Sequence, residues 1–305
     1  MNTQYLVNQP SEAIPYVARQ RGRSRAAACV IAVAGIFGLV GLAGMGTGAP
    51  VAGAAGLSPA TASSSTAANA AGAFPLPPGV LAKVTGLPLR DLVSAAEDKS
   101  LHVLRPQALP ASSRLFKSAG KPYILYMGAE YCPYCAAERW PLVMALAKFG
   151  TFSNLRRVAS SADDVYPSTP TFSFYGSTYT SRFVSFAPVE LNSNKVSPSS
   201  GSFAVLQYPT RLELRLFEQW DKAPYTSEAG GIPFVYIAGR YLVTGAQYDA
   251  GKISGWQMAA AATYMAAGNN PSSRAAEAAA GYLIADICSL TRDRPAPVCS
   301  VARRV

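Results

Sequence analysis

Apolar and polar positions divide the chain into four segments. No charged residue occurs between Arg25 and Lys83, and the run Ala26–Met45 has no strongly polar side chain. A helix of that length is about 30 Å long, enough to cross the hydrocarbon core of a bilayer. The next stretch is mostly Ala, Gly, Ser, Thr and Pro and offers few large side chains for a core. The pattern predicts a basic tail (1–25), a transmembrane helix (26–45), a flexible linker (46–80) and a folded domain (81–305).

Basic residues give the predicted anchor an orientation. Four arginines, at positions 19, 21, 23 and 25, precede the apolar run, and no basic residue follows it until Lys83. Because positive charge stays on the cytoplasmic side, we expect a single-pass protein of the cell membrane with its folded domain outside the cytoplasm. The alternative is a cleaved signal peptide, which would release a secreted protein. The lengths of the basic segment and of the apolar run favour the retained anchor.

Within the folded domain, the short run Tyr123–Met127 is typical of a buried strand. Apolar residues at 136, 140, 143 and 147 then recur with the spacing of one helix face. Pro133 suits the first turn of that helix, where no N–H is needed. Pro141 falls inside the helix and should kink it, leaving the carbonyl of Ala137 without its helical partner.

A second group of elements follows downstream. The sequence Gly-Gly-Ile-Pro at 230–233 precedes a strand at 234–237, a turn and a return strand ending at Gly245. Residues 210–220 alternate like a strand, but Thr210 and Glu213 form a capping-box pattern that favours a helix. Between the two groups of elements we expect an insertion of roughly 50 residues with strands at 171–174 and 183–191. Helices are expected further on, at 253–267 and 272–288.

Composition limits the function classes. Half of the residues are hydrophobic and 14% are charged, which excludes a wholly disordered chain. The formal net charge is +10, but part of the excess lies in the arginine-rich tail and the rest forms no cluster of Lys and Arg. Nucleic-acid binding needs such a cluster. No nucleic-acid partner is therefore predicted.

The chemistry-bearing motif is Cys132-Pro133-Tyr134-Cys135, which follows the strand and opens the helix. A thiol at a helix N-terminus faces free N–H groups and the positive end of the helix dipole, and both favour its thiolate. Cys132 is therefore the predicted nucleophile. Cys135, one turn further on, is placed to attack a mixed disulfide on Cys132 as the resolving thiol. Cys-x-x-Cys also occurs in zinc sites, but the flanking strand and helix favour redox chemistry.

These two groups of elements resemble the two halves of an α/β thioredoxin-like fold, in which helices flank a central mixed sheet. Here the sheet would carry the insertion and extra C-terminal helices, after one transmembrane helix. The tetrapeptide matches the motif typical of glutaredoxins, although no glutathione-binding pattern accompanies it. In this superfamily a cis-proline loop faces the dithiol and offers its backbone to an extended substrate. The resemblance assigns that loop to Ile232-Pro233 and implies client contacts by Tyr131, Pro133, Tyr134, Ile232 and Pro233.

Three longer stretches, 126–140, 149–155 and 164–174, resemble an uncharacterised family of membrane-anchored, thioredoxin-like proteins catalogued only as a domain of unknown function. This likeness covers roughly residues 80–300. It implies the fold and brings no established substrate.

The chain departs from thioredoxins at one position. Thioredoxins carry a buried carboxylate six residues before the first active cysteine, where it assists proton transfer, and Tyr126 stands at that position here. Glu130 and Glu138 are the acids closest to the motif and are candidates for proton transfer. For both glutamates, however, we expect an exposed and solvated side chain.

Two further cysteines, Cys288 and Cys299, lie near the C-terminus. Outside the cytoplasm, an even set of four exported cysteines suggests disulfides. A Cys288–Cys299 disulfide would close a short loop and hold the C-terminal tail, and the alternative is a second redox pair that relays electrons to the dithiol. No metal site is predicted, because the C-terminal spacing lacks a tight zinc knuckle and the only histidine, His102, lies in a separate segment. No cofactor is implied.

The leading hypothesis is a membrane-tethered thiol–disulfide oxidoreductase outside the cytoplasm, with a protein client and a separate redox partner. Its rival is a redox-inactive thioredoxin-like binding or scaffold module, in which Cys132 and Cys135 form a permanent structural disulfide. Copper handling by the dithiol is a third hypothesis, which the lack of a histidine in the motif weakens.

Overall fold

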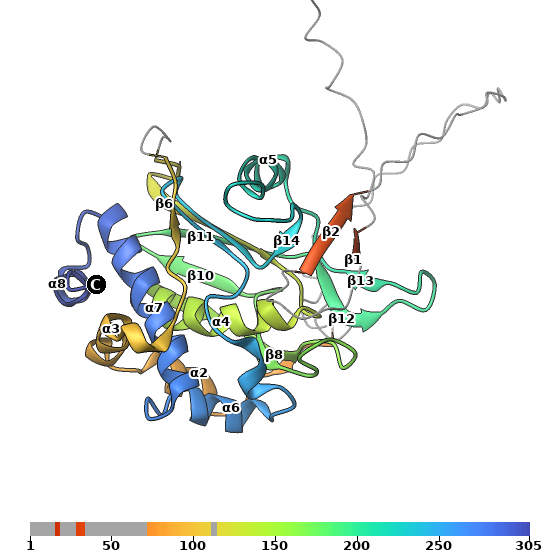
Figure 1. Ribbon diagram of the computed structural model, residues 1–305, viewed down its shortest axis with the longest axis horizontal. Helices are drawn as coiled ribbons and strands as arrows, with labels where there is room; N and C mark the ends of the chain where they lie inside the picture. Colours follow the sequence, from red (N-terminus) through yellow and green to blue (C-terminus); the bar gives the residue numbers. More distant parts are fainter. Residues whose placement is uncertain (1–15, 19–28, 34–71, 111–114) are drawn as a thin grey trace, which may run out of the picture.

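The computed structural model describes residues 16–18, 29–33, 72–110 and 115–305 (Figure 1). Over these residues the chain is mixed α/β, with helices on both faces of a mixed sheet. The described helices are α2 (Val80–Thr85), α3 (Leu89–Glu97), η1 (Lys99–Leu101), α4 (Pro133–Leu146), α5 (Arg211–Trp220), η2 (Ala250–Ile253), α6 (Met258–Met265), α7 (Pro271–Leu290) and α8 (Ala296–Ala302).

The central sheet has the strand order β11-β6-β15-β16-β4, and β5 pairs with β6 beside this path. The β11–β6 pair is parallel and the other pairs are antiparallel. Nearly all of β6 is buried, as expected for a strand covered on both faces. The bounds are β4 (Gln107–Ala108), β5 (Lys117–Ser118), β6 (Lys121–Gly128), β11 (Ser185–Glu190), β15 (Phe234–Ile237) and β16 (Tyr241–Thr244).

Smaller sheets surround this one. The described pairings are β7–β10, β3–β8–β9, β12–β13 and β1–β2–β14. The bounds are β1 (Tyr16–Ala18), β2 (Cys29–Val33), β3 (Phe74–Pro75), β7 (Gly150–Ser153), β8 (Arg156–Ala159), β9 (Pro170–Ser173), β10 (Thr178–Ser181), β12 (Asn192–Val196), β13 (Phe203–Val205) and β14 (Gly231–Ile232). Of the two strands predicted for the insertion, the one at 171–174 corresponds to β9. The strands β7, β10 and β13 were not predicted, because they are short and partly exposed.

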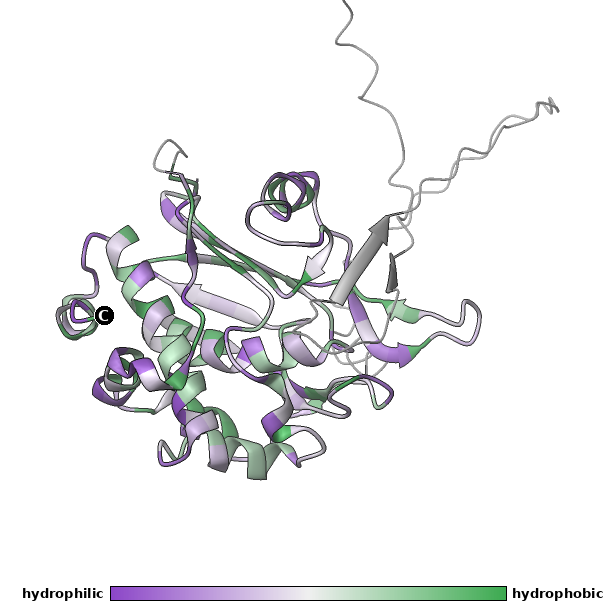
Figure 2. Cartoon of the chain, viewed as in Figure 1, coloured by the Kyte–Doolittle hydropathy of each residue, from purple (hydrophilic) through white to green (hydrophobic). Residues whose placement is uncertain are grey.

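Alternate side chains of β6 enter two apolar clusters. Ile124 and Tyr126 face the cluster that contains α4 and α7, whereas Tyr123, Leu125 and Met127 face the cluster that contains α5. This alternation follows from the period-two geometry of a strand. Figure 1 shows α5 on one side of the sheet and α4 and α7 on the other. Apolar residues are concentrated in the central strands, α6 and α7 (Figure 2).

Helix α4 is buried all round, although the sequence predicted only one apolar face. Thirteen of its residues are buried, because β9 and α7 cover the sides that the sheet does not. Pro141 lies inside the helix as predicted. The carbonyl of Ala137, which loses its helical donor to this proline, accepts a hydrogen bond from the hydroxyl of Tyr248 at 2.9 Å.

Other predicted elements are confirmed or corrected. The helix at 210–220 is confirmed with its reciprocal capping box, and the helix predicted at 272–288 is α7. The strand predicted at 183–191 is β11, but it lies in the central sheet beside β6 instead of in an insertion. The helix predicted at 253–267 begins later, because a turn at Gly255 (φ 76°) separates η2 from α6.

The predicted N-terminal segments lie mostly outside the described residues. This is true of the tail and the transmembrane segment, apart from β1 and β2, and of linker residues 46–71. Residues 72–80, also assigned to the linker, are folded: β3 pairs with β8, and Val80 begins α2. In the described part of the chain, no helix combines the length and hydropathy needed to cross a membrane.

Candidate active site

The two motif cysteines lie where the central strand β6 gives way to α4. Cys132 is the N-cap residue of α4, and its Sγ accepts a hydrogen bond from the backbone N–H of Cys135 at 3.3 Å. Both side chains are buried and both are thiols. The N-cap position satisfies a helix N–H that would otherwise lack a partner. A negative charge on Cys132 Sγ would therefore be stabilised by this N–H group and by the helix dipole.

The structure brings Ile232 to the same place. The Cys132 Sγ lies 3.8 Å from the carbonyl oxygen of Ile232, and the Ile232–Pro233 peptide bond is cis. Residues 231–232 form β14, whose backbone pairs antiparallel with β2. An extended segment therefore pairs with this short strand beside the dithiol, in the manner of β-strand addition.

The three aromatic or proline residues expected to contact a client differ in accessibility. Tyr131 is buried and stacks on Phe203 with a centroid distance of 4.3 Å. Pro133 is also buried, in the first turn of α4. Tyr134 is partly exposed and meets Tyr166 edge-on. Of these three, Tyr134 is the residue that a docked client can reach without a rearrangement.

Glu130 and Glu138 are both buried, which corrects the expectation that their side chains are solvated. Glu130 accepts a hydrogen bond from the Ser173 hydroxyl, and Glu138 accepts one from the backbone N–H of Gln247 at 3.1 Å. Burial raises the pKa of Glu130 to about 7, with a further contribution from the charge of Glu190. Burial also raises the pKa of Glu138 to about 8.

A buried ion pair lies beside Glu130. Arg139 donates two hydrogen bonds to Glu190, at 2.9 and 2.6 Å, and a third to the carbonyl of Ala129 at 2.8 Å. Neither charged side chain is exposed. A carboxylate and a guanidinium match each other in this two-point geometry. The pair therefore joins α4 to the end of β11, and its arginine also contacts the segment that leads to Cys132.

Cys135 occupies the interior end of the motif. Burial raises the pKa of its thiol well above the usual range, and the neighbouring Cys132 adds to the rise, whereas the charge of Arg139 opposes it. The two thiols therefore differ in their surroundings: one caps a helix, and the other is buried one turn deeper.

Glu138 gives a prediction for the pH dependence of folding. Its pKa is raised in the folded state, so the folded protein holds a proton that the unfolded chain releases near pH 4.5. The stabilising contribution is complete below that pH and is lost as pH rises towards about 8. At pH 8 we expect Glu138→Gln to be more stable than the wild type by up to about 4 kcal/mol, and therefore to unfold at a higher temperature. At pH 5 the two should unfold at similar temperatures.

Thermal unfolding at the two pH values measures this difference. Glu218→Gln is the matched control, because Glu218 is exposed on α5 and its substitution should change neither value. Equal behaviour of the two variants would contradict the assignment of Glu138 as a buried acid.

Cys288 and Cys299 are joined by a disulfide between α7 and α8. Both belong to the apolar cluster of α4 and α7, whereas Cys132 and Cys135 belong to the cluster of α5. The two pairs therefore lie in different parts of the core. This separation favours the structural role of Cys288 and Cys299 over an electron relay.

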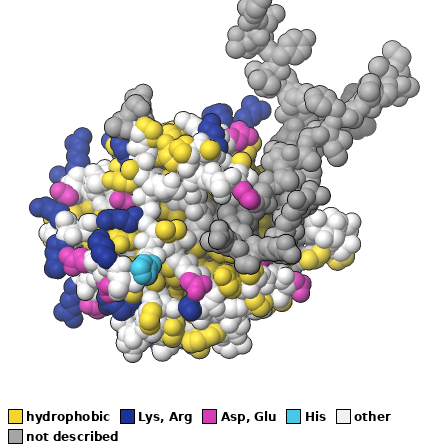
Figure 3. Space-filling view, viewed as in Figure 1, with side chains coloured by type: hydrophobic (Ala, Val, Ile, Leu, Met, Phe, Trp, Pro, Cys, Tyr) yellow, Lys and Arg dark blue, Asp and Glu magenta, His cyan; other side chains and the backbone are white. Residues whose placement is uncertain are grey.

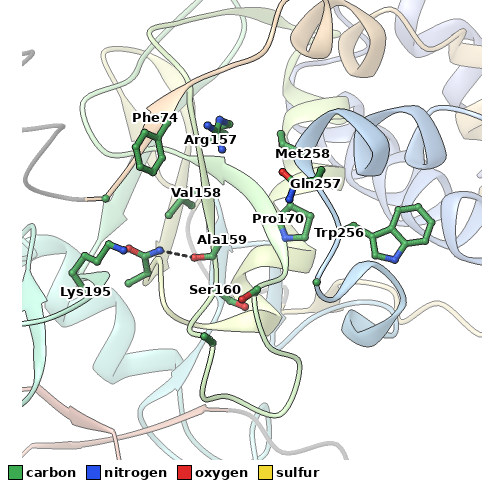
Figure 4. A pocket seen from close by; sticks show the side chains of 15 residues that line it. Phe74, Arg157, Val158, Ala159, Ser160, Pro170, Lys195, Trp256, Gln257 and Met258 are labelled. Carbon is green, nitrogen blue, oxygen red and sulfur yellow. Dashed lines mark hydrogen bonds between the residues drawn. The ribbon is translucent and has the colours of Figure 1, made fainter.

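Other candidate sites lie apart from the dithiol. A pocket of about 390 Å³ has Phe74 and Lys195 on one side and Gln257 and Met258 on the other (Figure 4). Its lining includes neither motif cysteine nor Ile232. Among the described residues, no group of three or more His, Cys, Asp or Glu side chains is arranged to hold a metal. His102 is exposed, and Lys and Arg on the visible face are interspersed with Asp and Glu (Figure 3).

Sequence reasoning missed Arg139, Glu190 and Gln247 as parts of this region, and it noted Tyr126 only as a departure from the thioredoxin pattern. Two signals were present. Glu138 and Arg139 are the charged residues of a helix that is otherwise almost entirely apolar, and such a helix is expected to be buried all round. Glu190 is also the only acid between Asp164 and Glu213.

Comparison with known proteins supports a family of unknown function. Residues 107–203 match a domain of unknown function, DUF929. This match runs from β4 to β13 and includes the dithiol, Arg139 and Glu190, but ends before Ile232. No curated protein and no solved structure matches the chain. The recognised likeness is thus narrower than the 80–300 range expected from the sequence.

Proposed function

We propose that the protein is a thiol–disulfide oxidoreductase with a thioredoxin-like fold. The strand order β11-β6-β15-β16, with α4 directly after β6 and a proline-led β15, supports this fold. The observation that carries the function is the position of Cys132 Sγ, between the N–H of Cys135 and the carbonyl of Ile232. The sulfur of the proposed nucleophile therefore lies beside a backbone segment that can hold an extended client.

The proposed reaction has two steps. The Cys132 thiolate attacks a client disulfide, forms a mixed disulfide and releases one client sulfur as a thiolate. Cys135 then attacks Cys132 Sγ, forms the Cys132–Cys135 disulfide and releases the second client sulfur. The client gains two electrons and the protein loses two, so a separate redox partner must reduce the dithiol again. The reverse sequence introduces a disulfide into the client.

The location of this activity is part of the proposal. The apolar run 26–45 and the arginines before it support a single-pass membrane anchor with the domain outside the cytoplasm. An exported domain is also the setting in which the Cys288–Cys299 disulfide persists. A protein client and a redox partner of the same compartment are the expected partners.

Trapping tests the proposal. In the full-length Cys135→Ala variant, the first step should proceed and the second should not, so a disulfide-bonded peptide should remain attached to Cys132. Mass spectrometry of the non-reduced protein measures the adduct. The Cys132→Ala variant is the matched control and should hold no adduct on Cys135, because burial keeps that thiol protonated.

The rival scaffold function predicts a different result. A permanent Cys132–Cys135 disulfide would have a reduction potential below about −300 mV, and Cys135→Ala would accumulate no adduct. A less negative potential together with the trapped adduct supports the oxidoreductase.

A further inference from the structure

Tyr126 places a buried hydroxyl group beside the resolving cysteine. Its side chain is fully buried, and its Oη has no hydrogen-bond partner among the described residues. Both the hydroxyl and Cys135 Sγ lie against Gly128: a Cβ atom added there would be 2.2 Å from Tyr126 Oη and 3.1 Å from Cys135 Sγ. The absence of a side chain at position 128 therefore leaves the phenol and the thiol as neighbours.

Arg139 brings a positive charge to the same space. Its guanidinium lies 5.6 Å from the centre of the Tyr126 ring. Glu190 and the carbonyl of Ala129 fix its orientation through three hydrogen bonds, while its Nη1 atom has no partner among the described residues. The guanidinium also opposes the effect of burial on the Cys135 thiol. The Arg139 guanidinium, held in one orientation, thus lies close to both the Tyr126 ring and the Cys135 thiol.

The unpaired hydroxyl is unusual for a purely structural tyrosine. A buried polar group without a hydrogen bond destabilises the folded state, and phenylalanine would fill nearly the same volume without this cost. The Tyr126 ring already packs edge-on against Phe174, so packing does not require the oxygen. A hydrogen bond that forms only during the reaction would account for the hydroxyl.

We propose that Tyr126 is a catalytic residue of the resolving step, whose hydroxyl donates a hydrogen bond to Cys135 Sγ as negative charge develops there. Arg139 is a positioning residue that stabilises this charge. In the step, Cys135 Sγ forms a bond to Cys132 Sγ, the bond from Cys132 to the client sulfur breaks, and the proton of Cys135 ends on the departing client sulfur. The inference rests on the proposed function and names the groups that assist its second step.

The charged and titratable surroundings of Cys135 are few. Cys132 at the start of α4 and Arg139 on the next turn of that helix act on the Cys135 thiol. Tyr126 approaches from β6, and Glu190 at the end of β11 acts on Tyr126, with Glu130 beside the ion pair. Removal of the Tyr126 hydroxyl leaves all the other groups in place. The pH profile of the resolving step therefore isolates its contribution.

The experiment uses the full-length reduced protein and a chromogenic aromatic disulfide. Attack by Cys132 releases the first chromophore, and attack by Cys135 on the resulting mixed disulfide releases the second. For Tyr126→Phe we expect an unchanged first phase and a second phase slowed about tenfold at neutral pH, because the midpoint of its pH profile rises by about one unit. The melting temperature should not fall, since the hydroxyl has no partner to lose.

Tyr179→Phe is the matched control. Tyr179 donates a hydrogen bond to the carbonyl of Leu146 at 2.8 Å, at the far end of α4. This variant should therefore melt at a lower temperature than the wild type and keep the wild-type pH profile of the second phase.

An unchanged second phase in Tyr126→Phe would overturn the proposal, as would equal slowing of both phases. Absence of a second phase in the wild type would instead refute the oxidoreductase function itself. The two failures are therefore distinguishable.

Discussion

Replacing Arg139 by methionine is expected to destabilise the protein by about 3–5 kcal/mol, because it leaves the carboxylate of Glu190 buried without its counter-charge. Glu190 accepts two hydrogen bonds from Arg139 and one from the N–H of Phe174 at 3.2 Å. Neither side chain of the pair is exposed. Chemical unfolding followed by circular dichroism measures the change.

Two comparisons show whether burial is the cause. Arg304 and Glu97 form an ion pair with the same two-point geometry, at 3.1 and 3.0 Å, but on the surface. Arg304→Met should therefore cost less than about 1 kcal/mol. The double variant Arg139→Met/Glu190→Gln should regain much of the lost stability, because no unpaired buried charge remains. A loss for Arg139→Met as small as that for Arg304→Met would contradict this account of the ion pair.

The parts of the site that were predictable are those governed by local chemistry. The position of Cys132 at the N-cap of α4 follows from local sequence alone. The signals are a run of strand-forming residues, two cysteines one turn apart and a proline in the first helical turn. The capping box of α5 is likewise encoded by Thr210 and Glu213 alone. Even the free carbonyl caused by Pro141 was predictable, although the donor that satisfies it, Tyr248, was not.

The unpredicted parts depend on pairs that lie far apart in the chain. Glu190 is 51 residues from Arg139, and Gln247 is 109 residues from Glu138. An isolated glutamate or arginine is usually exposed, so a local reading places these groups in solvent. The pairing of Arg139 with Glu190 follows from the parallel pairing of β11 with β6, and the sequence pattern had assigned β11 to an insertion. The contact between Glu138 and Gln247 depends instead on the segment that follows β16.

The difference between the two thiols gives the second large expected effect. In the reduced full-length protein at neutral pH, a small alkylating reagent should modify Cys132 at least about tenfold faster than Cys135, since each pKa unit changes the thiolate fraction about tenfold. Cys135 N–H donates to Cys132 Sγ at the N-cap, whereas burial raises the pKa of Cys135 well above its usual range. Both side chains are buried, so a difference in exposure cannot produce this order.

Peptide mass spectrometry after timed quenching assigns the label to each cysteine in the full chain. Cys288 and Cys299 provide an internal control, because their disulfide should leave both unlabelled until a reductant opens it. Raising the pH should narrow the difference between the motif thiols, because Cys135 gains thiolate only as the pH approaches its raised pKa. Equal labelling of the two thiols, or labelling of Cys135 first, would remove Cys132 as the nucleophile and leave the scaffold function in its place.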